Sequence, residues 1–77
     1  SPDQVRAVVM PSSQRNVFET TKILRKLVDA GPITIREPDT NENHTAYFKS
    51  ANTIHYQTDS GYADGVELIW DRFVVNT

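Results

Sequence analysis

The side chains that could carry out chemistry are few and lie apart in the sequence. The chain has two histidines, His44 and His55, together with ten carboxylates and no cysteine. Nucleophilic catalysis needs a Ser, Thr or Cys beside an oriented histidine, and no Gly-x-Ser-x-Gly turn presents a serine in that way. The spacing selects no pair of carboxylates for acid–base work, and a domain of 77 residues rarely encloses an active-site cleft. The sequence therefore predicts no catalytic residue and no enzymatic activity.

Metal and cofactor sites need clustered ligands, which the sequence does not supply. The two histidines are eleven residues apart, and no His-x-x-x-His pattern or carboxylate–histidine pair supports either of them. The acidic loop from Asp59 to Asp64 does not follow the ligand spacing of a calcium loop. The three glycines are scattered, so the sequence contains no glycine-rich phosphate loop. We therefore predict no metal and no cofactor, and we interpret both histidines as ordinary surface or core residues.

Charge is distributed unevenly along the chain. Residues 1–36 carry six basic and three acidic side chains, a balance of +3, whereas residues 37–77 carry two basic and seven acidic ones, a balance of −5. An asymmetry of this kind can steer a nucleic acid or a protein partner toward the basic half. It also fits a solvated helix face that acidic loops balance, and the sequence leaves both interpretations open.

One helix is predicted over residues 16–30. Asn16 can cap its first turn, and Glu19 stands where its side chain can reach back to the cap amide. Gly31 can adopt the left-handed conformation that ends a helix, and Pro32 prevents its continuation. An apolar stripe repeats at helical spacing, with charged residues on the remaining surface. The stripe consists of Val17, Thr20, Ile23, Leu24, Leu27 and Val28.

The rest of the chain is typical of short strands separated by polar loops. Residues 50–52 are interpreted as the turn of a hairpin, and Asp71 as a tight turn. Polar loops are predicted over 37–43 and 59–65, where Pro, Asx and Gly residues favour turns. Adjacent strands at this spacing pair antiparallel, which gives a meander. The predicted strands cover residues 32–36, 45–49, 53–58, 66–70 and 72–75.

Residues 1–10 fit two structures. Ser1 followed by Pro2 is typical of a capped helix start, with proline at the first helical position. Val5, Val8 and Val9 are β-branched and favour a strand instead. Pro11 ends either element.

These elements predict one α+β domain, residues 1–77, in which one main amphipathic helix packs on an antiparallel meander sheet. A second helix is left open, and the domain is expected to come from a larger protein because the chain begins without methionine. The face that the helix covers is predicted to hold Ile33, Ile35, Tyr47, Ile54, Tyr56, Val66, Leu68, Trp70 and Val74. The opposite face is predicted to hold Phe48, His55, Ile69, Phe73 and Val75, and to be covered by residues 2–10 or by a partner.

Aromatic residues next to basic ones indicate a binding function. Exposed aromatics on strands can stack nucleic-acid bases while neighbouring cations hold phosphates. The competing interpretation is that the aromatics form the core, because a small domain needs most of its aromatics inside. The residues predicted to bind RNA are Lys22, Arg25, Lys26, Phe48, Lys49 and His55.

Three strings of the sequence are similar to those of a known family. Residues 17–21, 46–58 and 64–68 resemble the C-terminal part of the SARS-unique region of betacoronaviruses, within the large nonstructural protein that carries the papain-like protease. A second register also exists. Residues 8–11, with the helix and strand that follow, resemble the last β-α-β unit of the preceding macrodomain-like module of that protein.

The resemblance implies a frataxin-like fold and a non-enzymatic accessory role in a viral replicase polyprotein. The implied partners are single-stranded RNA, viral or host proteins and neighbouring domains, in the host cytoplasm at replication membranes. The alternative is a protein-binding or spacer module without nucleic-acid affinity. Frataxin-like folds close with a second helix after the sheet, which this sequence does not indicate. Frataxins bind iron along an acidic helix, whereas Lys22, Arg25 and Lys26 make this helix basic, so no iron site is implied.

The ligand inventory predicts that the domain binds no metal tightly. Isothermal titration calorimetry with zinc, iron and calcium should show no stoichiometric site, because no group of ligands has the density that these ions require. A stoichiometric site of micromolar affinity for any of the three ions would contradict this prediction.

Overall fold

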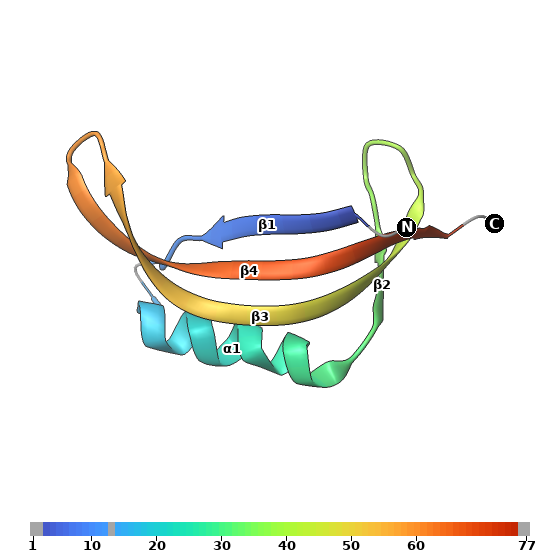
Figure 1. Cartoon of the computed structure of the whole chain (residues 1–77), viewed down its shortest axis with the longest axis horizontal. Coiled ribbons are helices and arrows are strands. Elements are labelled where there is room, and N and C mark those ends of the chain that lie inside the picture. Colours follow the sequence, from blue (N-terminus) through green and yellow to red (C-terminus); the bar gives the residue numbers. More distant parts are fainter. Residues whose placement is uncertain (1–2, 13, 76–77) are drawn as a thin grey trace.

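The computed structural model describes residues 3–12 and 14–75, which form one helix on a four-stranded antiparallel sheet. The strands lie in the order β1-β4-β3-β2, and every neighbouring pair is antiparallel. Figure 1 shows α1 lying along one face of the sheet beneath β3. The predicted α+β class is therefore confirmed. The elements are β1 (Asp3–Val9), α1 (Val17–Ala30), β2 (Ile33–Arg36), β3 (Asn43–Thr58) and β4 (Gly61–Val75).

The helix begins and ends where its capping residues predict. Asn16 has an extended backbone, and its side-chain oxygen accepts a hydrogen bond from the Glu19 amide at 2.9 Å. This bond satisfies one of the amides that have no partner within the first turn. At the other end Gly31 has φ 79°, a conformation that costs glycine little and other residues more. Among the described residues α1 is the only helix.

The first residues of the chain form an edge strand rather than a helix. β1 pairs with β4 from Asp3 opposite Arg72 to Val9 opposite Val66. The β-branched valines therefore decide between the two predicted structures, because β4 offers them a sheet to pack on. The alternative helix start at Ser1 and Pro2 lies outside the described residues.

Two predicted turns are wrong, because β3 and β4 are each one long strand. β3 runs without interruption through residues 50–52, and Asp71 pairs with Tyr47 inside the ladder. The loop predicted over 59–65 is shorter than expected, because the connection is only Asp59 and Ser60 and β4 begins at Gly61, which has φ 130°. The polar residues of 50–52 mark a solvated stretch of strand, since an antiparallel sheet can face water on one side.

A bulge in β3 determines which side chains enter the core. Phe48 pairs with Trp70 and Ser50 pairs with Ile69, so Lys49 has no residue opposite it. One extra residue reverses the alternation of faces beyond it. As a result Phe48, 6% exposed, and Ala51, 3% exposed, both lie under the helix although they are three residues apart, whereas Tyr47 is 47% exposed on the open face.

The sequence-based prediction had Tyr47 and Phe48 on the opposite faces, because alternation alone does not decide which of two adjacent apolar residues faces the core. It also placed Ile54 and Tyr56 under the helix, whereas the alternation that puts Ala51 and Thr53 there turns both to the open face.

The core lies between α1 and the middle of β3 and β4. The rings of Phe48 and Trp70 are 5.6 Å apart and tilted by 41°. Ala46 and Ala51 are almost fully buried, and such small side chains let a helix approach the sheet closely. Four residues pack there as predicted, namely Ile33, Val66, Leu68 and Trp70. The prediction for the Val75 side chain lies outside the described part of the structure. The helix contributes Val17, Leu24, Leu27 and Val28.

Within the described part of the chain, no helix has the length and apolar character that a membrane span requires.

The contact between helix and sheet predicts the effect of shortening Leu24, which packs against the core. Leu24→Ala should lower the free energy of unfolding by roughly 2–5 kcal/mol, because it removes buried methyl groups and leaves a cavity. Lys26→Ala, on the exposed side of the same helix, is the control. Equal melting temperatures for the two variants would contradict the packing.

The faces that Tyr47 and Phe48 occupy predict unequal effects for these two adjacent aromatics. Phe48→Ala should destabilise by roughly 3–5 kcal/mol in urea unfolding, since it empties the core beside Trp70. Tyr47→Ala should cost less than about 1 kcal/mol, because its side chain is half exposed. The reverse order would show that Tyr47, not Phe48, faces the core.

Candidate binding groove

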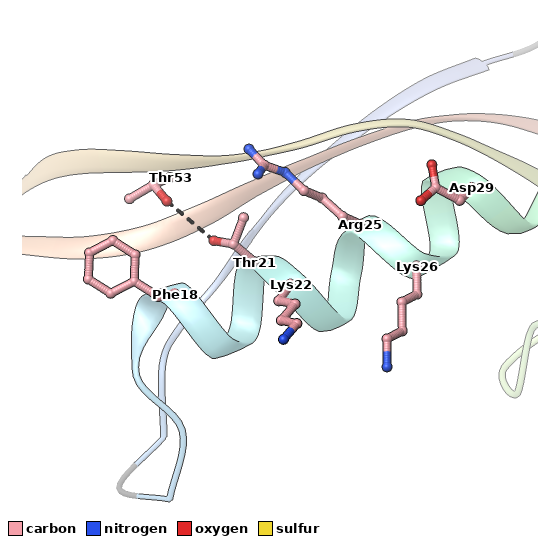
Figure 2. Close-up of a pocket in the computed structure, with 7 residues that line it drawn as sticks. All are labelled: Phe18, Thr21, Lys22, Arg25, Lys26, Asp29 and Thr53. Atoms are coloured by element: carbon pink, nitrogen blue, oxygen red, sulfur yellow. Dashed lines mark hydrogen bonds between the residues drawn. The ribbon is translucent and has the colours of Figure 1, made fainter.

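A groove of about 550 Å³ lies between one flank of α1 and β3, and we call it the α1 groove. Residues three or four positions apart on a helix share a flank, which brings Phe18, Lys22 and Arg25 into one row. Figure 2 shows Arg25 directed toward β3, while Lys22 and Lys26 point away from the sheet. The groove is lined by Phe18, Thr21, Lys22, Arg25, Lys26, Asp29 and Thr53.

Two threonines fix the helix to the strand inside the α1 groove. Thr21 is buried, and its hydroxyl donates to the Val17 carbonyl at 2.8 Å, as threonines inside helices often do. The hydroxyl oxygens of Thr21 and Thr53 are 3.2 Å apart (Figure 2). Because the Thr21 hydrogen is used by Val17, the Thr53 hydroxyl can donate its own to Thr21. The groove therefore has a defined polar contact at its base.

Arg25 connects the helix to the backbone of β3. Its Nε donates to the carbonyl of Ala51 at 3.1 Å. A second hollow of about 300 Å³ continues along the same flank, where Arg25 and Asp29 face the stretch of β3 from Lys49 to Asn52. Arg25 and Asp29 therefore border both hollows, whereas Lys22 and Lys26 line only the α1 groove.

Most of the outer side of β3 has no strand beside it. β2 pairs only with the stretch from Asn43 to Ala46. The outer side of residues 47–58, which we call the free edge of β3, pairs with no other strand in the described residues. Such an edge carries backbone donors and acceptors that another chain can use.

The contact of Arg25 shows which backbone groups the free edge presents. In an antiparallel strand the N–H and C=O of one residue point to the same side, and the sides alternate along the chain. Because Arg25 reaches the Ala51 carbonyl from the outer side, Thr53, His55 and Gln57 also direct their backbone groups outward. The residues between them pair with β4.

The six residues predicted to bind RNA do not form one site. Lys22, Arg25 and Lys26 do meet in the α1 groove. The prediction that Phe48 is available for stacking is wrong, because it shares the helix-covered face with Ala46 and lies in the core. Lys49 borders the second hollow, but its Nζ lies 3.0 Å from a carboxylate oxygen of Asp71.

His55, the sixth of these residues, lies on the far arm of the β3–β4 hairpin, which bends away from the helix (Figure 1). Its Nδ1 is 2.7 Å from an oxygen of Asp64, the residue opposite it on β4. Its ring stacks on Tyr62 with centroids 4.9 Å apart and planes 9° apart. The side chains of His55 and Asp64 are both more than half exposed, so this cluster stands in solvent.

Both histidines have carboxylate partners, which corrects the expectation that neither would. His44 Nε2 is 3.4 Å from Glu42 in addition to the His55–Asp64 pair. Glu42 immediately precedes β3, two residues before His44, and its carboxylate lies beside the ring. Asp64 meets His55 only through the pairing of β3 with β4. No group of three or more metal-ligating side chains occurs in the described residues.

Sequence reasoning missed two exposed aromatics, Phe18 and Tyr62. Phe18 is 75% exposed at the entrance to the α1 groove, although it is a large apolar side chain. Phe18 lies outside the apolar stripe of the helix, and this position could have predicted that its ring is exposed. Tyr62 had no such signal, because its contact with His55 depends on the strand register.

Comparison of the chain with protein-family models, curated proteins and solved structures finds no match. The resemblance to the SARS-unique region therefore stays a prediction.

Proposed function

We propose that this domain is a non-enzymatic protein-contact module, and that an extended segment of its partner adds to the free edge of β3. The observation that carries this proposal is the outward row of backbone groups at Thr53, His55 and Gln57. A segment that adds as a strand satisfies those groups with main-chain hydrogen bonds, and its alternate side chains meet the surface beside the edge. The α1 groove provides that surface along the helix side.

Catalysis is a weaker interpretation of the same features. The His55–Asp64 pair has the form of an oriented base, but both side chains are more than half exposed. Acid–base catalysis depends on a site that positions a substrate and excludes water. The hairpin arm, with its exposed Tyr62, offers no enclosed space of this kind among the described residues.

Single-stranded RNA is the second candidate ligand, favoured by the three helix cations and the exposed ring of Phe18. RNA affinity comes largely from contacts between cations and phosphates. Here Arg25 is bonded to a backbone carbonyl, Lys49 is paired with Asp71, and the net charge is −2. These features favour a protein partner over an RNA strand.

The role of the domain within a larger protein is a proposal as well. We propose an accessory role in a viral replicase polyprotein, as the resemblance implies, with viral or host proteins or neighbouring domains as partners. Strand addition is suited to such a role, because it uses main-chain groups that every extended segment carries.

Strand addition predicts that blocking one outward amide abolishes binding. Phage-displayed random peptides of about ten residues would be selected on the wild-type domain and then tested on Thr53→Pro. Proline lacks the amide hydrogen and is tolerated where that amide faces outward, so the β3–β4 ladder should remain. We expect selected peptides to bind the wild type in fluorescence anisotropy and to lose at least about tenfold in affinity on the variant.

Thr53→Val is the matched control, because it removes the hydroxyl contact with Thr21 and keeps the amide. It should bind the selected peptides as the wild type does. Circular dichroism would verify that both variants are folded, and Gln57→Pro supplies a second blocked amide should Thr53→Pro unfold. Selected peptides that bind the proline variants unchanged, or a selection that yields no binder, would overturn the proposal.

A further inference from the structure

We infer that the segment added to β3 is acidic, with Asp or Glu at alternate positions facing α1. This inference rests on the proposed strand addition and names the chemistry of the partner. Arg25 contacts the edge itself, and Lys22 and Lys26 line the α1 groove beside Thr53. Asp29 is the one carboxylate among the groove's lining residues. The free edge of β3 is thus bordered by positive charge on one face of the sheet.

The direction of the added side chains follows from the face that Ala51 and Thr53 occupy. Ala51 lies in the core under the helix, and Thr53 contacts Thr21 of the helix. Residues directly opposite each other in an antiparallel pair place their side chains on the same face. Those opposite Ala51 and Thr53 therefore project toward α1 and over the α1 groove. The intervening residues project toward the open face, where the helix cations do not reach.

Arg25 can exchange one hydrogen-bond acceptor for another when a strand is added. In the structure its guanidinium satisfies the Ala51 carbonyl, which has no strand partner on that side among the described residues. An added strand supplies a main-chain N–H to this carbonyl and releases the guanidinium. A carboxylate opposite Ala51 then offers Arg25 a charge-assisted hydrogen bond, which is stronger than its bond to a neutral carbonyl. The exchange favours an acidic residue over a neutral one at that position.

The same charges argue against a second copy of this chain as the occupant. Two copies that joined their β3 edges into one antiparallel sheet would be related by an axis perpendicular to the sheet. Both α1 helices would then lie on the same face, and the flank of each that carries Lys22 and Arg25 would adjoin that of the other. Like charges that are brought close together repel, and charged side chains at a sheet edge commonly prevent self-pairing. An acidic partner meets no such barrier.

Three synthetic peptides of one alternating frame would test the inference. Each has about ten residues, long enough at roughly 3.3 Å per residue to span most of the free edge. Threonine and valine occupy one set of alternate positions, and glutamate, glutamine or lysine the other. Fluorescence anisotropy at low and moderate salt would compare them on the folded domain. We expect the glutamate peptide to bind most tightly, to weaken with salt, and to fail on Thr53→Pro.

Removing the cations gives the matched test. Lys22→Gln/Arg25→Gln should weaken the glutamate peptide by about fivefold, from two surface charge contacts, and leave the glutamine peptide nearly unchanged. Arg15→Gln/Arg36→Gln removes the same charge from outside the α1 groove and should change neither affinity by more than about twofold, because salt screens distant charges.

The contrary results separate the acidic partner from strand addition and from RNA binding. Equal affinity for the glutamate and glutamine peptides, or tighter binding of the lysine peptide, overturns the acidic partner but leaves strand addition intact. Failure of the glutamate peptide, while the phage selection yields neutral binders, has the same meaning. Tighter binding of a single-stranded oligouridylate of similar length, weakened by Lys22→Gln/Arg25→Gln, assigns the α1 groove to RNA and overturns the inference.

Discussion

The pairing of β3 with β4 is the interaction on which the rest of the structure depends. The ladder runs from Asn43 opposite Val75 to Thr58 opposite Gly61. β1 and β2 attach to its two sides, and α1 covers part of one face (Figure 1). Because β2 pairs with only the first residues of β3, the long ladder leaves one side of β3 without a strand in the described residues. The free edge is therefore a consequence of the unequal lengths of neighbouring strands.

The bulge at Lys49 links the core to the candidate site. Phe48 lies beside Trp70 just before the bulge, and the added residue places Ala51 under the helix as well. The small Ala51 side chain lets α1 approach closely enough for Arg25 to reach its carbonyl. Bulges are common at sheet edges, where they redirect side chains and interrupt pairing. Here one bulge both completes the core and brings a cation to the free edge.

Charge and backbone geometry cooperate at the free edge. Exposed strands invite pairing with copies of the same chain, and natural proteins limit this with charged side chains and bulges. Arg25 satisfies one outward carbonyl, while Lys22 and Lys26 increase the positive charge of the flank. An arrangement that discourages self-pairing is also one that prefers an acidic segment. Protection against association and selectivity for a partner thus have the same physical source.

Local chemistry determined what the sequence by itself revealed. Asn16 and Gly31 delimit the helix, its apolar stripe identifies its buried face, and the β-branched runs indicate a sheet, because capping and periodicity act within a few residues. The tertiary structure decided the rest. The choice of strand for residues 3–9, the exchange of Tyr47 and Phe48 between faces, and the meeting of His55 with Asp64 all depend on strand register. Register joins residues distant in sequence, and a single inserted residue changes it, so no local pattern reveals it.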